Sequence, residues 1–388
     1  MLTELKKIIF LFGLLSVSFH LSAEKNVRIG LLSLDKPLSI NVSIGSGQYN
    51  MKTGGESFIL NEHDNILIVR AGEKILVSIP RHRTLLVDSM VLEPEAGDNY
   101  FSLRNNLRAE IEREYSGSLV VKSDIASLSV VNEVDLVDYL RAVVQAEAGF
   151  KGGLEYFKTQ ALLARTYLYM HYFNHARDGF NLCDNTHCQV YHGISQTAII
   201  REAVEETKDK VLVNADSMLV FTPFHSNCGG QTESPENVWL TAMPHISEVT
   251  DPYCAFSRNA RWTREIDKTE WIKYLAVHGY KHRDDRDLEF EQLSRKRDYT
   301  AGDFSYPLTR IRAEWGLKSA FFSLKPDNDI IRLEGRGYGH GVGLCQEGAW
   351  VMAERGFKMK EIIGFYFRDL LIAGINDVRP APVVSSTF

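Results

Sequence analysis

Short apolar runs separated by polar clusters dominate the first third of the chain. The runs include Val27–Leu32, Ile66–Val69, Lys74–Ile79 and Ser118–Val121, and glycine or Asn/Asp clusters stand between them. Runs of this length that are bounded by turn-forming residues are typical of β-strands. The pattern therefore predicts that this part of the chain is rich in β-structure.

The next part of the chain shows helical spacing instead. In Asp135–Glu147, the apolar residues Leu136, Leu140 and Val143 recur on one side, and acidic residues occupy the opening turn. Glu147 follows Leu136 by eleven positions, which is close to a whole number of turns, so its carboxylate is expected on the apolar face. A carboxylate there is unfavourable unless it is protonated or paired. The alternative is a frayed last turn that leaves Glu147 in solvent.

Helical spacing also recurs in three later segments. We expect helices over Leu154–Phe173, Gln346–Arg355 and Met359–Arg368. Arg165 lies among apolar residues of the first of these helices. It is either a surface residue whose stem covers apolar area or a partner for a carboxylate such as Glu147.

The pattern is less regular over residues 261–330. The charged stretch Lys281–Arg297 is interpreted as a solvated loop or helix face. Neither an internal repeat nor a low-complexity linker divides the chain. We predict an α+β fold in which a β-rich part, 24–130, is followed by a mixed helix and strand region, 131–375, and a tail, 376–388.

The N-terminus has the pattern of an export signal. Lys6 and Lys7 precede an apolar run from Ile8 to Leu15, and Ala23 offers a small residue for cleavage. The run is too short to span a bilayer, and no later segment is long and apolar enough. We predict a signal peptide over 1–23 and an exported chain, in the periplasm or on the cell-wall side of the cytoplasmic membrane. The alternative is a buried N-terminal strand.

The composition restricts the kinds of function that the chain can have. The 388 residues carry a net charge of −6 and no Lys/Arg-rich run, which argues against a nucleic-acid partner. The cysteine count is five, so at least one thiol lies outside any intrachain disulfide. In an oxidising compartment, a bound metal is one way to keep thiols from pairing.

Four potential metal ligands lie within one short segment. His175, Cys183, His187 and Cys188 supply the two imidazoles and two thiols that a tetrahedral Zn2+ takes. A closed set of four ligands leaves no position for a catalytic water, so we expect a structural zinc. Alternatives are a disulfide between the two cysteines, free buried thiols, or substitution of His171 or His192 for one of the histidines.

Glycine alternates with single side chains in Gly335–Gln346, which reads Gly-Arg-Gly-Tyr-Gly-His-Gly-Val-Gly-Leu-Cys-Gln. Such a tract lets the backbone adopt positive φ and approach another surface closely. It does not fit the dinucleotide-binding pattern G-x-G-x-x-G. The side chains of this tract that could take part in catalysis or binding are chiefly those of His340 and Gln346. The alternative is a glycine-rich strand pair at the edge of a sheet.

A second polar loop, Phe224–Gln231, follows a strand-like segment and contains His225 and Ser226. The nucleophile-elbow pattern G-x-S-x-G is absent, so a serine nucleophile is disfavoured. A binding or orienting role for His225 is preferred, and a structural histidine is the alternative.

Several motifs in sequence order resemble the stage II sporulation protein D family, also called the SpoIID/LytB domain. They are Asn132–Glu147, Lys158–Tyr167, Cys183–Tyr191, His225–Gly230, Val238-Trp239 and Gly337–Gln346. The resemblance covers roughly residues 26–375. It implies a SpoIID-type catalytic region around one cleft, which would occupy the region 131–375.

The resemblance also implies an activity and a set of residues. The activity is that of a lytic transglycosylase, which cuts the MurNAc–GlcNAc bond of peptidoglycan glycan strands and leaves 1,6-anhydro ends. The family's catalytic glutamate falls on Glu147, and its zinc ligands, in members that have them, fall on His175, Cys183, His187 and Cys188. We expect the following residues to bind the sugar: Arg165, Gln189, Tyr191, His225, Ser226, His340 and Gln346.

Two other functions remain open at this point. A non-catalytic wall-binding protein that enhances an amidase would share the fold without needing an acid, and a zinc hydrolase would need an exchangeable water on the metal. The chain also departs from the family pattern by placing Cys228 and Cys345 where serines are usual. Together with Cys254 they are in segments that could meet, either as a Cys228–Cys254 disulfide or as a group of thiols near the cleft.

Overall fold

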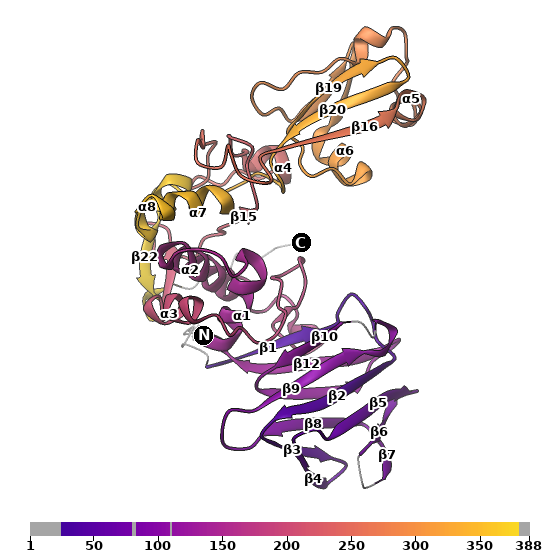
Figure 1. The fold of residues 1–388 in the computed structure, drawn as a ribbon, viewed down its shortest axis with the longest axis vertical. Coiled ribbons are helices and arrows are strands. Elements are labelled where there is room, and N and C mark those ends of the chain that lie inside the picture. Colours follow the sequence, from indigo (N-terminus) through magenta and orange to yellow (C-terminus); the bar gives the residue numbers. More distant parts are fainter. Residues whose placement is uncertain (1–24, 80–82, 109–110, 380–388) are drawn as a thin grey trace, which may run out of the picture.

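The computed structural model describes residues 25–79, 83–108 and 111–379. Two mainly antiparallel sheets form most of its N-terminal part (Figure 1). The first sheet has the order β13 (Leu182–Cys183), β1 (Asn26–Leu31), β12 (Leu128–Asp135), β11 (Ser118–Ser123), β8 (Ser89–Pro94), β3 (Gln48–Thr53) and β4 (Glu56–Asn61). The second sheet has the order β10 (Glu112–Tyr115), β9 (Tyr100–Asn105), β2 (Ser39–Ser46), β5 (Asn65–Ala71), β6 (Lys74–Ser78) and β7 (Thr84–Val87).

The strands form as their apolar pattern predicts. In β2, buried and partly exposed residues alternate, so Ile40, Val42 and Ile44 share one inner face. The inner faces of the two sheets pack on each other, as the edge-to-face contact of Tyr49 from β3 with Phe101 from β9 shows, with ring centroids 5.8 Å apart. One strand of the first sheet, the parallel edge strand β13, comes from the segment with the metal-ligand pattern.

Helices form the part of the molecule that follows the two sheets. The helices are α1 (Leu136–Ala148), α2 (Leu154–Met170), α3 (Ala198–Glu206), α4 (Pro235–Trp239), α7 (Gln346–Glu354) and α8 (Met359–Tyr366). Helix α1 begins where the Asp135 carboxylate accepts a hydrogen bond from the N–H of Val137, at 2.8 Å. Helix α2 is central because α1, α3, α7 and α8 all contact it. Its burial on nearly all sides explains its many small and apolar residues.

Arg165 is part of this central packing. Its guanidinium is buried in α2 and donates to the main-chain oxygens of Thr207 at 2.7 Å and Val204 at 3.1 Å. The partners of the side chain are therefore carbonyls at the end of α3, not a carboxylate. Neither sequence interpretation, a surface residue or a partner of Glu147, describes this arrangement.

A further lobe spans residues 261–336 and has its own hydrophobic core. Its elements are β16 (Arg261–Asp267), α5 (Lys268–Val277), η3 (Asp285–Leu288), β17 (Asp298–Ala301), β18 (Phe304–Pro307), α6 (Leu308–Trp315), β19 (Phe322–Asp327) and β20 (Ile330–Arg336). Strands β16, β20 and β19 form an antiparallel sheet over a core rich in aromatic residues, among them Trp271 and Tyr299. The sequence did not reveal this separate core.

One part of the charged stretch in this lobe is buried. Arg295 is 7% exposed and forms an ion pair with Glu233 at 3.4 Å. The interpretation of Lys281–Arg297 as a wholly solvated segment is therefore wrong at its C-terminal end. Burial of this cation is tolerated because it is paired and also donates to main-chain oxygens of Gln231 and Cys228.

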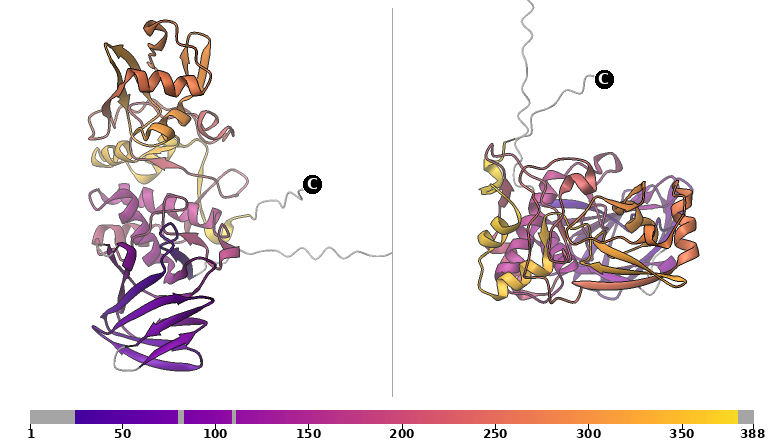
Figure 2. Two further views of the ribbon diagram at one scale, coloured as in Figure 1. Left: turned by 90° about the vertical axis from the view of Figure 1, so that its right-hand side faces the viewer. Right: turned by 90° about the horizontal axis from the view of Figure 1, so that it is seen from above.

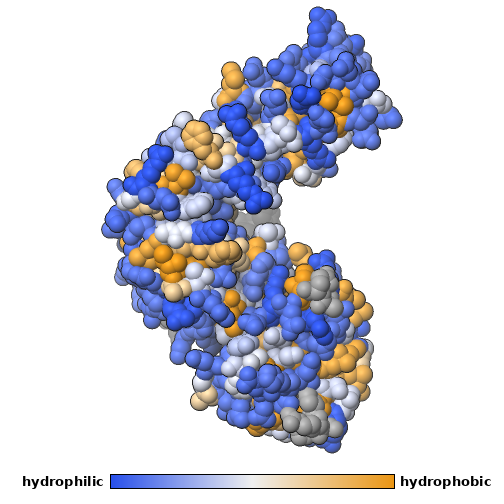
Figure 3. All heavy atoms as spheres, viewed as in Figure 1, coloured by the Kyte–Doolittle hydropathy of each residue, from blue (hydrophilic) through white to orange (hydrophobic). Residues whose placement is uncertain are grey.

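Viewed from the side, the sheets, the helices and the lobe follow one another along the long axis (Figure 2). The surface is hollowed between the lobe and the N-terminal sheets on the face shown in Figure 3. The α+β prediction is confirmed, and β12 runs across the predicted division at residue 130. The remaining elements are η1 (Asn106–Arg108), η2 (Ala176–Asp178), β14 (Lys210–Val213), β15 (Phe224–His225), β21 (Leu344–Cys345), β22 (Leu371–Gly374) and η4 (Ile375–Asp377).

The predicted signal peptide lies outside the described residues, as does the predicted tail from residue 380 onward. Among the helices of the described ranges, none has the length and apolar character to cross a membrane.

Candidate functional site

Glu147 lies in the last turn of α1 and points into a pocket of about 320 Å³. The side chain is half-buried. Its Oε1 accepts a hydrogen bond from the main-chain N–H of Val190 at 2.7 Å. Within the part of the chain that the structure describes, no donor contacts Oε2. One carboxyl oxygen is therefore held in place, and the residue lines the pocket.

The surroundings of Glu147 favour its protonated form. Burial raises the pKa of the carboxyl above its ordinary value of 4.5, and the N–H of Val190 opposes this only in part. The C-terminal end of a helix carries partial negative charge, which also disfavours an anion at this position. Such a group can remain protonated closer to neutral pH than an ordinary glutamate, as a general acid must.

The opposite wall of the pocket comes from the start of α7. Gln346 is buried and donates from Nε2 to the main-chain oxygen of Glu147 at 3.1 Å. This bond satisfies one of the carbonyls that every helix leaves without an intrahelical partner at its C-terminus. Ser226 also lines the pocket and accepts a main-chain hydrogen bond from Glu347 at 3.1 Å. The structure therefore brings Glu147, Ser226 and Gln346 together.

The glycine tract holds this wall against the loop that follows β15. Gly337 has φ of 79°, and a Cβ there would lie 2.5 Å from the main-chain oxygen of Asn227. Gly343 has φ of 74°, and a Cβ there would lie 2.2 Å from the main-chain oxygen of Pro223. Positive φ and close approach of the backbone are both as the sequence predicts. The tract ends in β21, which pairs in parallel with β15.

A second carboxylate in the pocket was missed in the sequence. Glu347 follows Gln346, and its two oxygens accept hydrogen bonds of 2.6 Å from the side-chain amides of Asn259 and Asn227. Phe150 and Trp350 add apolar surface to the same pocket. The signal that could have revealed Glu347 is its place in the first turn of the helix that opens directly after the glycine tract.

His225 and His340 form a pair next to the pocket, with ring centroids 5.5 Å apart. Neither is among the residues that line the Glu147 pocket. Burial and the nearby Arg312 lower the pKa of His340 to about 4. Burial also lowers the pKa of His225 well below its usual range. Both imidazoles are therefore neutral at neutral pH, and Nδ1 of His340 accepts from the N–H of Val342 at 3.1 Å.

Gln189 and Tyr191 lie inside the protein rather than on the pocket surface. Each is 1% exposed. Gln189 accepts from the hydroxyl of Tyr139 at 3.3 Å, and the hydroxyl of Tyr191 donates to the side chain of Asn132 at 2.8 Å. These contacts, like those of Arg165, lie within the protein, and none of the three residues lines the Glu147 pocket.

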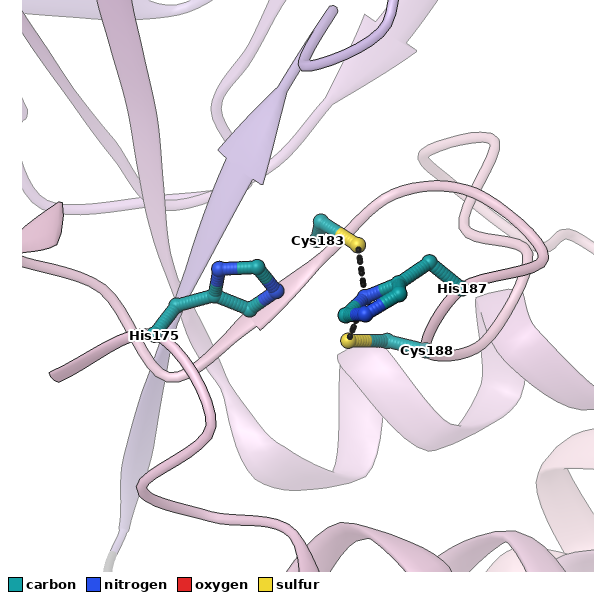
Figure 4. A group of neighbouring side chains, drawn as sticks. All are labelled: His175, Cys183, His187 and Cys188. Carbon is teal, nitrogen blue, oxygen red and sulfur yellow. Dashed lines mark hydrogen bonds between the residues drawn. The ribbon is translucent and has the colours of Figure 1, made fainter.

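The four predicted metal ligands meet at one point (Figure 4). One ligand atom from each of His175, Cys183, His187 and Cys188 lies within 4.8 Å of all the others. The Sγ atoms of Cys183 and Cys188 lie 3.6 Å and 3.5 Å from Nδ1 of His187. Two thiols and two imidazoles at this spacing fit a tetrahedral zinc.

The surroundings of the cluster fit a metal as well. Nε2 of His175 is buried without a hydrogen-bond partner. Nδ1 of the same ring contacts the carboxylate of Asp178 at 2.9 Å. A metal-binding histidine commonly uses its other nitrogen in this way, which fixes the orientation of the ring. The cluster precedes Val190 in the chain, so a metal bound there would anchor the segment whose N–H holds Glu147.

Comparison with known proteins agrees with the motifs. The sequence profile of the SpoIID family, described as a stage II sporulation protein, matches residues 125–214, which include Glu147 and the four-residue cluster. An uncharacterized protein of Brachyspira hyodysenteriae is 30% identical over 382 residues, or 93% of this chain and 97% of its own. The stage II sporulation protein D of Bacillus subtilis is 26% identical over 75% of this chain and 91% of its own.

The amidase enhancer of Bacillus subtilis is also similar. It is 28% identical over 283 residues, which are 59% of this chain and 39% of the enhancer. The similarity to the Brachyspira protein extends over almost the whole of both chains. Together with the profile match and the relatives named stage II sporulation protein D, it shows that the chain belongs to the SpoIID family.

Proposed function

We propose that this chain is an exported peptidoglycan lytic transglycosylase in which Glu147 is the single acid and base. The observation that carries the proposal is the state of Glu147, which lines a pocket and has a carboxyl with a raised pKa and one oxygen held by Val190. The relatives named for sporulation and for amidase enhancement support a role at the cell wall.

A single carboxyl group is sufficient for this reaction. The proton on Oε2 of Glu147 passes to the glycosidic oxygen as the bond from that oxygen to C1 of MurNAc breaks. The C6 hydroxyl of the same sugar then bonds to C1 and gives its proton to the carboxylate, which restores the acid. Because the attack is intramolecular, it avoids the entropy cost of recruiting water. A hydrolase would need a second carboxylate to activate a water or to act as the nucleophile.

Glu347 is suited to a supporting role in this scheme. Both of its oxygens already accept hydrogen bonds from asparagine amides, so its orientation is fixed. A fixed negative charge in the pocket would stabilise the positive charge that develops on the sugar ring in an oxocarbenium-like transition state.

We propose a structural zinc on His175, Cys183, His187 and Cys188. With four protein ligands the metal would have no open position for water, so it would supply rigidity rather than reactivity. The role of the metal would be to hold in place the segment that leads to Val190. Export rests on the predicted signal peptide over residues 1–23 and suits a substrate outside the cytoplasmic membrane.

The experiment uses purified glycan strands, both intact and stripped of stem peptides by an amidase. We expect the chain to release products with 1,6-anhydro ends, which mass spectrometry identifies. Glu147→Gln should lower the rate at least about 100-fold, because a positioned general acid contributes roughly that much or more. The matched control is Glu202→Gln on α3, since Glu202 is exposed and does not line the pocket.

A second function is favoured by the similarity to the amidase enhancer. If the chain raises the rate of an amidase on intact peptidoglycan but releases no anhydro ends, the enhancer function is correct and the enzymatic one is refuted. Reducing ends in place of anhydro ends would also refute the transglycosylase, because they require attack by water.

A further inference from the structure

A second group of metal-binding side chains lies in the interior, apart from the predicted zinc ligands. We call it the Cys3Asp cluster; it consists of Cys228, Asp251, Cys254 and Cys345. One ligand atom from each residue lies within 4.8 Å of the other three. All four side chains are 0% exposed.

Three separate parts of the chain supply the cluster. Cys228 follows β15, Asp251 and Cys254 lie in the loop between α4 and β16, and Cys345 is the N-cap of α7. Sγ of Cys228 lies 3.3 Å from Sγ of Cys254 and 3.2 Å from Oδ2 of Asp251. The cluster thus joins segments that are far apart in sequence and that carry little regular structure of their own.

Ordinary packing does not account for a carboxylate in this position. Among the described residues, Asp251 forms no ion pair. The guanidinium of Arg295 contacts the main-chain oxygen of Cys228 at 2.8 Å, but its ion pair is with Glu233. A buried carboxyl group beside three thiols is unfavourable unless it is protonated or bound to a cation. A divalent metal would offset two of the four negative charges that the ionised groups carry.

The groups around the cluster hold the ligands in a metal-binding orientation. The N–H groups of Cys228 and Gly348 point at Sγ of Cys345, at 3.3 Å and 3.4 Å. Main-chain donors of this kind stabilise a thiolate, which is the form that binds metal. The hydroxyl of Tyr366 donates to Oδ2 of Asp251 at 2.9 Å, and the N–H of Tyr253 donates to Oδ1 at 2.8 Å. Metal-bound carboxylates are typically fixed by such secondary hydrogen bonds.

A disulfide explains the cluster less completely. All five cysteines are free thiols in the structure, although Cys228 and Cys254 are close. A disulfide between them would leave Cys345 and Asp251 buried with no charge partner, whereas a metal uses all four groups. In a tetrahedral site with bonds of about 2.3 Å, neighbouring sulfurs lie roughly 3.8 Å apart, so only small movements are needed.

We propose that the Cys3Asp cluster binds a second structural Zn2+. Three soft thiolate ligands favour zinc over magnesium or calcium, and four protein ligands leave no position for a catalytic water. The metal would tie the N-terminus of α7 to the loop after β15. Ser226 and Gln346, which line the Glu147 pocket, are each within two residues of a ligand. The inference does not depend on the proposed reaction.

The test is the zinc content of the purified chain, dialysed against Zn2+ and then against buffer without chelator. Native mass spectrometry should find two zinc ions per chain. Cys254→Ser should retain one, Cys188→Ser should also retain one, and the double variant should retain none. A wild-type content of one zinc, unchanged by Cys254→Ser, would overturn the proposal. A Cys228–Cys254 disulfide in the unreduced peptide map would overturn it as well.

Two further measurements guard against a variant that fails to fold. Asp251→Asn keeps the shape of the side chain, and we expect it to lose the second zinc to a chelator at least about 10-fold faster than the wild type does. In the Cys188→Ser variant loaded with Co2+, sulfur-to-cobalt absorption should persist because three thiolates remain. Its absence from a folded Cys188→Ser protein would refute the second site.

Discussion

Replacement of Glu147 by glutamine should make the folded protein more stable relative to the wild type as the pH rises. Below the ordinary pKa of 4.5, the carboxyl is protonated in both the folded and the unfolded chain. At higher pH the unfolded chain releases the proton, while the folded chain retains it until its raised pKa is reached. The folded wild type therefore binds more protons and loses stability with rising pH. A glutamine at this position does not titrate, so it adds no such pH dependence to the stability.

The size of this effect follows from the position of the side chain. Each tenfold difference between the two acid dissociation constants corresponds to about 1.4 kcal/mol in the free energy of unfolding. The helix end alone contributes about 0.3–1 kcal/mol against the anion. Burial adds to that contribution and outweighs the hydrogen bond from Val190. We therefore expect the variant to gain at least about 0.3–1 kcal/mol relative to the wild type between pH 4.5 and pH 8.

Urea unfolding of both proteins over this pH range measures the difference, and other titrating groups cancel from it. Glu155→Gln is the control with the opposite sign. Burial alone would raise the pKa of Glu155, but the N–H of Met359 and the ammonium of Lys158 outweigh it and lower the pKa. The wild type should therefore gain stability over Glu155→Gln as the pH rises from this lowered pKa to 4.5, so the control series extends below pH 4.5. If the wild type also gained stability over Glu147→Gln, the carboxylate would be the favoured form in the pocket and the reasoning would fail.

Three further predictions concern residues that do not line the pocket. Gly337→Ala should lower the free energy of unfolding by about 1–3 kcal/mol through crowding against Asn227; urea unfolding should show a smaller loss for Gly72→Ala, which also has positive φ but meets no atom within 4 Å. Arg165→Leu should lower the thermal midpoint and leave the zinc content unchanged, because its guanidinium serves buried carbonyls; a raised KM with unchanged stability would instead show that it binds substrate. The imidazole NMR signals of His340 should not titrate between pH 5 and 8, because its pKa lies at about 4; an inflection in that range would contradict the buried, neutral ring.

Local patterns were sufficient to predict the elements that carry Glu147 and the first group of metal ligands. The helical period of α1 depends on neighbours within a few turns, and the four ligands of the first cluster lie within fourteen residues of one another. The roles of Arg165 and Tyr191 could not be predicted in this way. Both residue types suit sugar binding, and only the packing of α2 and the first sheet shows that they are buried.

Long-range packing also explains why other features of the structure could not be predicted from the sequence. Asp251 and Glu347 meet their partners through contacts that span more than twenty residues, and no local spacing signals such contacts. The three cysteines near Asp251 were expected to lie in segments that could meet, but the carboxylate was not. The lobe at 261–336 was missed because its core depends on scattered aromatic residues such as Trp271 rather than on a clear period.

The two metals that we propose would explain how an irregular pocket can hold one carboxyl group in a defined geometry. The contacts to Glu147 come from Val190 and Gln346, and neither residue lies in the interior of a regular element. Ordering such segments costs roughly 1–2 kcal/mol of backbone entropy per residue. Cys188 lies two residues before Val190, and Cys345 immediately precedes Gln346. A metal in each cluster would restrict both segments before substrate arrives, so the orientation of the acid would depend on cross-links that take no part in the reaction.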